Sequence, residues 1–358
     1  MKIAMMSRWN ATCGISAHAE LVGREWVKKN DLTVFAPTLE SATDWHHNPI
    51  EKEDEEFVIR GYEQPESIGK TGWIDERLWK EDYDVLVIQG LELLPIPTLL
   101  EKFPKIEAKK VLVWHVGKLP IYEDLYKLNF DAVVCFDFRF KNMLKGKYPE
   151  EIIRIIPFPC RPVAKVKVKV KGDSDKKRAR NELGIPGERT ILFSFGKQPL
   201  SEYKDYLWLA NELKEIYDLK YFVLRSYGDL PPESEFLEVR RGRPEYEEIY
   251  KYLRAADIFL LPRPETEDIV VSSTVFQCLG VLTPIVVPEV RYVELMDKEI
   301  VKYKNREDLK EKVIRLIEDK DLKEGVLRHA EHYARENSAE KIAKKFVRLF
   351  EDITTTSA

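Results

Sequence analysis

The chain has 358 residues, of which 44% are hydrophobic and 34% are charged, and its formal net charge is −4. This length predicts two domains, and the composition predicts apolar cores with a strongly charged exterior. The weak negative charge, without a long basic stripe, argues against a nucleic-acid partner. The four cysteines form no C-x-x-C pair, which argues against a zinc site and a disulfide framework. Because no run of about 20 apolar residues occurs, we expect a cytoplasmic protein.

The first 160 residues alternate short apolar runs with amphipathic stretches, the pattern of a parallel sheet whose strands are joined by helices. These elements predict a Rossmann-like N-terminal domain over residues 1–160. We expect a helix over 17–29 and strands at 2–6, 32–36, 85–89, 111–114, 132–136 and 152–157.

A proline-rich segment at 157–162 interrupts this pattern and predicts an interdomain linker. The alternation of lysine and valine at 163–171 favours an exposed strand or linker, with contact to an anionic surface as the alternative. The pattern then restarts and predicts a second Rossmann-like domain over 161–338, followed by a helical end over 339–358. Its expected elements are helices at 176–183 and 206–216 and strands at 190–195, 221–225, 258–261 and 284–287.

The predicted fold class is α/β, with two doubly wound domains that face each other across a cleft. Ligands of such sheets bind at the carboxyl ends of the strands. In the first domain Gly14 precedes a helix and permits a ligand to approach the backbone, although a plain tight turn explains it equally well. His115 follows the apolar run 111–114, where its side chain could bond a sugar or move a proton. A structural histidine is the alternative.

Two segments of the second domain have the chemistry of an anion site. Lys197 and Lys204, with Gly196 allowing close approach, can hold a diphosphate as point charges. Exposed lysines without a ligand are the alternative. The hydroxyl residues Ser272, Ser273 and Thr274 stand at an expected helix start and can donate to a phosphate there. Simple capping of that helix explains them as well.

Taken in order, these segments resemble the large retaining glycosyltransferase family with the GT-B fold, which uses nucleotide-sugar donors. Residues 1–20, with Gly14 and His18, resemble its first strand and acceptor-side loop, and 111–115 resembles its strand with a histidine near the transferred sugar. Residues 250–262 resemble the segment that precedes the family's donor loop. The end of the chain, 339–358, is similar to a closing helix that crosses back to the N-terminal domain.

The resemblance also assigns the donor side. Gly196 and Lys197 with Lys204 are similar to the Gly-Arg and Lys that hold the donor diphosphate, with lysine in place of arginine. If Gly280 is aligned with the family's turn, Glu267 takes the first position of its paired-glutamate motif, whereas Val275 takes the second, ribose-binding position. Ser272, Ser273 and Thr274 are then expected to grip the phosphates in a different way.

The resemblance implies a retaining transferase of the hexosyltransferase type, which needs neither a metal nor a cofactor besides its nucleotide-diphosphate sugar donor. Glu267 is expected to orient the sugar hydroxyls and His115 to contact the sugar or the acceptor. The acceptor, a sugar, lipid or small molecule, would bind the N-terminal domain, and contact with a membrane surface stays open. The alternatives are a nucleotide-sugar epimerase on the same scaffold and a catalytically silent sugar- or nucleotide-binding protein.

Overall fold

The chain forms two compact units in a computed structural model that describes residues 1–42, 52–161, 163, 168–185, 187–226, 228–229, 231, 234–242 and 245–355. Of residues 168–174 it describes the backbone alone. Unit 1 comprises Met1–Pro159, Asp268–Ser273 and Asn337–Ala358, and unit 2 comprises Cys160–Glu267 and Thr274–Glu336.

Unit 1 contains a seven-stranded parallel sheet in the order β3-β2-β1-β4-β5-β6-β7. Every residue of the central strand β4, Val85–Gln89, is buried. A strand that is buried on both faces requires covering helices on both sides of the sheet, which explains its continuous apolar run. The other strands are β1 Lys2–Met6, β2 Asp31–Pro37, β3 Val58–Tyr62, β5 Lys109–Val113, β6 Ala132–Cys135 and β7 Ile153–Ile155.

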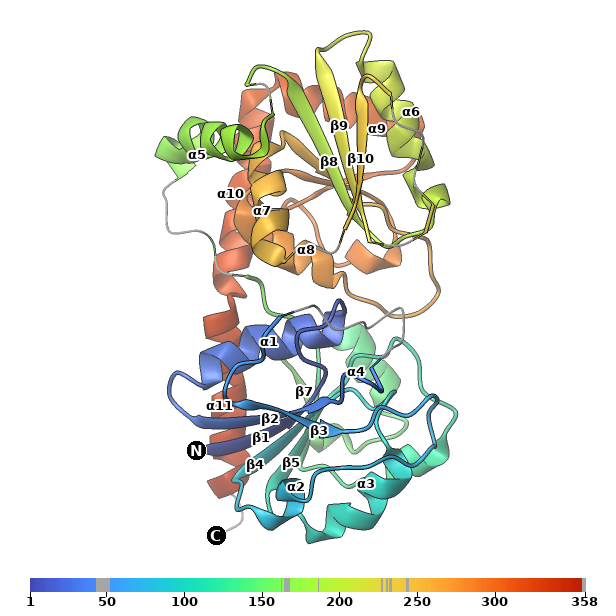
Figure 1. Cartoon of the computed structure of the whole chain (residues 1–358), viewed down its shortest axis with the longest axis vertical. Helices are drawn as coiled ribbons and strands as arrows, with labels where there is room; N and C mark the ends of the chain where they lie inside the picture. Colours follow the sequence, from blue (N-terminus) through green and yellow to red (C-terminus); the bar gives the residue numbers. More distant parts are fainter. Residues whose placement is uncertain are drawn as a thin grey trace. The chain divides into compact units, whose positions relative to one another are not determined.

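The helices of unit 1 include one from the far end of the chain. Helix α11, Ala339–Thr355, packs on α1, Gly14–Trp26 (Figure 1). The indole Nε1 of Trp26 donates to the carbonyl of Ala343 at 3.2 Å, and its ring meets the rings of Phe346 and Phe350 edge-on. The remaining helices are α2 Arg77–Lys80, α3 Ile96–Lys102 and α4 Phe138–Leu144, with 3₁₀ turns at Phe103–Lys105, Glu123–Lys127 and Glu150–Ile152.

Unit 2 contains a six-stranded parallel sheet in the order β10-β9-β8-β11-β12-β13. Its strands are β8 Thr190–Gly196, β9 Leu219–Arg225, β10 Leu237–Arg241, β11 Ile258–Leu260, β12 Ile285–Pro288 and β13 Val301–Tyr303. Its helices are α5 Val168–Leu183, α6 Lys204–Leu213, α7 Tyr246–Ala255, α8 Ser273–Cys278, whose first residue belongs to unit 1, α9 Arg306–Glu318 and α10 Lys320–Glu336, with 3₁₀ turns at Leu200–Tyr203, Leu279–Val281 and Arg291–Val293.

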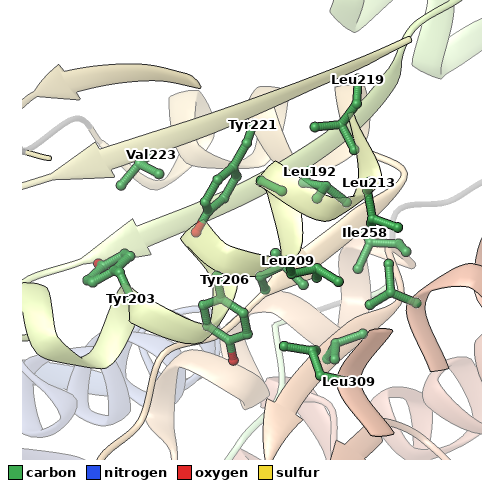
Figure 2. Close-up of a cluster of buried hydrophobic side chains, with 14 of the residues drawn as sticks. Leu192, Tyr203, Tyr206, Leu209, Leu213, Leu219, Tyr221, Val223, Ile258 and Leu309 are labelled. Carbon is green, nitrogen blue, oxygen red and sulfur yellow. The ribbon is translucent and has the colours of Figure 1, made fainter. Parts of the chain in front are cut away.

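The core of unit 2 lies between its sheet and helix α6. Figure 2 shows Tyr206, Leu209 and Leu213 of this helix beside side chains of the strands. The buried hydroxyl of Tyr206 donates to the carbonyl of Leu261 at 2.8 Å, so this polar group is satisfied inside the core. Because Leu261 directly follows β11, the bond ties the helix to the end of that strand.

The predicted fold class is confirmed, because both units are α/β with parallel sheets of the same strand order. Two expectations need correction. The backbone is helical from Val168, so the strand or linker expected over 163–171 is wrong for 168–171, and residues 164–167 lie outside the described ones. Strands β3, β10 and β13 were not expected, and all three are edge strands with exposed or half-exposed polar residues that break the apolar run.

We predict that Phe346→Ala lowers the free energy of unfolding by about 3–5 kcal/mol, because it leaves a cavity between α11 and α1. The measurement is guanidinium denaturation followed by tryptophan fluorescence. Phe138→Ala is the matched control, because this phenylalanine is 56% exposed and surface substitutions change stability by about 0.5 kcal/mol or less. Equal losses of unfolding free energy in the two variants would contradict the prediction that the contact between α11 and α1 stabilises the fold.

Candidate functional site

In each unit the strand order reverses beside the first strand, between β1 and β4 in unit 1 and between β8 and β11 in unit 2. Connections from the two strands at such a point leave toward opposite faces of the sheet and open a crevice at the carboxyl edge. Ligands of open parallel sheets bind there. The two candidate sites are therefore the carboxyl edges of the two sheets, and each is described by itself.

The unit 1 edge holds the predicted residue His115, two positions after β5. Its Nε2 lies 2.9 Å from Oε1 of Gln89, the last residue of β4. Burial holds the pKa of His115 well below its ordinary value, and the nearby His18 and Arg8 add to this effect. His115 is therefore a neutral imidazole at physiological pH, which can form hydrogen bonds but carries no positive charge.

The structure brings the predicted residue His18 against His115, with ring centroids 5.2 Å apart. His18 is 0% exposed, and the rings of Phe136, Phe158 and Phe346 also surround it. Burial lowers its pKa to about 3, although the side chain of Gln89 opposes this shift. A contact of His18 with an acceptor would require these rings to move. In this structure the ring of His18 reaches the carboxyl edge by packing against the ring of His115.

The predicted residues Gly14 and Ser273 lie together within unit 1. Gly14 begins α1, and a Cβ atom added to it would lie 3.2 Å from Oγ of Ser273. Gly14 thus permits the segment Asp268–Ser273 to approach the start of this helix. Ser272, in the same segment, is buried.

At the unit 2 edge, Gly196 ends β8 with a φ of +143°, and Lys197 follows it half-buried. The positive φ at position 196 would strain any residue with a Cβ atom, so this backbone favours glycine. Lys204, the first residue of α6, is exposed. The predicted Gly-Lys turn therefore lies at the strand-order reversal of this sheet.

Two buried arginines, which the sequence analysis did not single out as site residues, stand at the same edge. Arg225 ends β9 opposite Gly196 in the register, and its guanidinium lies 4.9 Å from the ring centroid of Tyr203. Arg263 follows β11 and donates from Nη2 to Oγ1 of Thr274 at 2.5 Å. Burial raises the pKa of Tyr203 to about 12, although both guanidiniums oppose this shift. The Tyr203 hydroxyl is therefore within electrostatic range of both cations.

The remaining predicted residues differ in their surroundings. Thr274 is held by Arg263, whereas Glu267 is exposed and has no hydrogen bond or ion pair within the described part of the chain. Val275 is 0% exposed, so the position that resembles a ribose-binding glutamate belongs to the core of unit 2. A signal for Arg225 was present in the sequence, because it is the last residue of an expected strand.

Within the described residues, no group of three or more histidine, cysteine, aspartate or glutamate side chains is arranged to hold a metal ion. Among the helices that the structure describes, none combines the length and the apolar character needed to cross a bilayer.

The fold is shared with solved structures, although no protein-family model matches the chain. A glycosyltransferase from Rickettsia africae superimposes with a TM-score of 0.66 at 13% identity, over 99% of each chain. An E. coli structure described as trehalose-6-phosphate bound with UDP-2-fluoro glucose gives 0.62 at 11% identity, over 99% of each chain. A Listeria monocytogenes structure described as a putative UDP-N-acetylglucosamine 2-epimerase gives 0.56 at 10% identity, over 100% of this chain and 97% of that one. At these identities the likeness shows the two-domain α/β fold of GT-B structures.

We predict that His18 makes the protein less stable in mild acid. Its folded-state pKa of about 3 lies below the unfolded value of about 6.5, so the unfolded chain binds the proton more tightly. The stability from keeping His18 neutral is present above pH 6.5 and is lost as the pH falls toward 3. At 1.36 kcal/mol per pKa unit, this loss is about 2 kcal/mol at pH 5 relative to pH 8.

Denaturation at pH 8 and pH 5 measures this loss. His18→Phe should remove it while keeping a ring among the surrounding aromatic side chains. His329→Phe is the control, because His329 is exposed on α10. An acid dependence that is the same in His18→Phe and in the wild type would refute the assignment.

Proposed function

We propose that the chain transfers a sugar from a nucleotide-diphosphate donor to an acceptor, and that the carboxyl edge of the unit 2 sheet holds the donor diphosphate. The observation that carries this proposal is the convergence of Lys197, Arg225 and Arg263 at the strand-order reversal, beside the glycine turn at Gly196. Two of these cations are buried, and the conformation of Gly196 leaves the backbone open to close approach.

The chemistry of this edge suits a departing diphosphate. Burying a guanidinium costs free energy, which an anion that binds beside it offsets. Cations fixed in position before the reaction stabilise the charge that develops on the leaving group, and they do so more strongly where water is excluded. Arg225 and Arg263 can supply the forked donors that Lys197 lacks. We propose that Lys204, exposed at the start of α6, contacts the solvent-facing end of the donor diphosphate.

The other residues complete the proposal. We assign Glu267 to hydrogen bonds with sugar hydroxyls, because its carboxylate is exposed and unpaired within the described chain. The neutral imidazole of His115 would contact the sugar or the acceptor. Ser272, Ser273 and Thr274 would contribute hydroxyl groups, with Thr274 already held by Arg263. The E. coli structure with the same fold holds a UDP-sugar, which is the donor class that we propose.

A nucleotide-sugar epimerase is the second candidate, because the Listeria structure with this fold is described as a putative epimerase of that kind. An epimerase converts its nucleotide sugar without an acceptor. The discriminating measurement is therefore product formation from the donor alone. Formation of a different nucleotide sugar from the donor alone would show epimerisation and would overturn the proposal of sugar transfer.

We predict that Lys197→Ala together with Lys204→Ala lowers kcat/KM for transfer by at least about 100-fold, since each charge-assisted hydrogen bond contributes about 1.5–3 kcal/mol. The donor is found first, by thermal-shift screening with UDP-, GDP-, ADP- and CDP-sugars, because a ligand that binds only the folded protein raises its melting temperature. Transfer is then measured with the donor that stabilises the protein.

The matched control is Lys298→Ala. Lys298 is an exposed lysine that precedes β13, at the amino edge of the same sheet. It should leave donor binding and transfer unchanged. Full activity in the double variant would remove the diphosphate assignment, and the absence of binding by any nucleotide sugar would remove the proposed function.

A further inference from the structure

The loop after β1 carries a buried arginine that lacks an acidic partner. Arg8 is 5% exposed and stands at the strand-order reversal of the unit 1 sheet. Its one hydrogen bond within the described residues runs from Nε to Oε1 of Gln64, at a long 3.4 Å. The same described part of the chain holds no carboxylate within 4 Å of its guanidinium.

Two other buried arginines of the described chain, Arg139 and Arg180, are paired with carboxylates. Arg139 forms an ion pair with Asp137 at 2.8 Å, and Arg180 forms one with Asp257 at 2.9 Å. A buried cation without a counter-charge loses its hydration without a compensating attraction, which destabilises the folded chain. An anionic group of a ligand would therefore supply the counter-charge that the guanidinium of Arg8 lacks among the described residues.

The acidic residues near this loop do not fill that role. Glu55 accepts from Trp9 and forms an ion pair with Arg24 at 2.9 Å. Asp54 accepts from Asn10 and forms an ion pair with Arg60. Both carboxylates therefore already form ion pairs with arginines other than Arg8.

The unit 1 edge carries a second cation besides Arg8. It is Lys118, exposed after β5, and Glu92, after β4, interacts electrostatically with both Arg8 and Lys118. Burial raises the pKa of Glu92, and the two cations oppose that shift. His115 faces Arg8 as a neutral ring. Arg8 and Lys118 thus lie within electrostatic range of the same exposed carboxylate.

We infer that the acceptor of the proposed transfer carries an anionic group, a phosphate or a carboxylate, which binds Arg8 at the carboxyl edge of the unit 1 sheet with Lys118 as the second cation. The planar guanidinium suits either group, because its forked donors match two oxygens at once. This inference rests on the proposed function, since it concerns the substrate that receives the sugar.

Calorimetric titration of the full chain tests it with three probes: glucose, glucose 6-phosphate and glucuronate. We expect one of the two charged sugars to bind at least about 10-fold more tightly than glucose, the effect of one charge-assisted contact. The charged sugar that binds identifies phosphate or carboxylate as the group. Arg8→Gln should abolish the preference, and Arg8→Lys should retain part of it.

Arg77→Gln is the matched control, because Arg77 belongs to the same unit but is already paired with Asp75 at the surface. It should keep the full preference. Equal affinity for charged and neutral sugars, or an undiminished preference in Arg8→Gln, would overturn the inference.

Stability without any ligand gives a second readout. Since Arg8 has no counter-charge among the described residues, Arg8→Gln should melt no lower than the wild type, whereas loss of a structural cation would lower the melting temperature. A clear drop in the melting temperature of Arg8→Gln would show that Arg8 stabilises the fold and would overturn the inference.

Stabilisation of the protein by nucleotide sugars is measured separately. If a donor binds and no anion preference is found, the acceptor inference alone fails; if no donor binds, the proposed function fails.

Discussion

The parallel direction of all strands within each sheet is the constraint on which both candidate sites depend. Parallel strands end at one edge, so residues that are far apart in the chain meet there without any local sequence signal. In unit 2 the register places Arg225 opposite Gly196, and Arg263 follows the neighbouring strand. In unit 1 the same geometry joins Arg8 to Gln64. The helices that cover both faces leave the carboxyl edge as the accessible place for polar chemistry.

The two edges share an electrostatic character. Their fixed charges are chiefly cationic, and the histidines of unit 1 remain neutral at physiological pH because burial lowers the pKa of each. Such edges attract and orient anions rather than exchange protons through histidine. This character fits the transfer of a group from an anionic leaving group, in which electrostatic stabilisation contributes more than acid–base catalysis.

Much of the fold could be predicted from the sequence, because the interior strands are continuous apolar runs. The edge strands β3, β10 and β13 were missed, since half-exposed strands tolerate polar residues such as Arg60, Glu238 and Lys302. For the site, position relative to a strand end was enough to select His115 and Lys197. It was not enough for Arg8 or Arg263, whose significance depends on burial and on partners far along the chain. Burial of His18 is likewise a tertiary property, set in part by Phe346 of the last helix.

The contact between α1 and α11 has a consequence for how the protein is made. Trp26 is synthesised early, whereas Ala343, Phe346 and Phe350, which pack on it, belong to the last described helix. Chains fold from the N-terminus as they emerge from the ribosome. Unit 1 must therefore wait for the whole of unit 2 to be translated before its first helix is covered. During that interval the indole of Trp26, which is 1% exposed in the folded chain, lacks the cover that Phe346 and Phe350 provide.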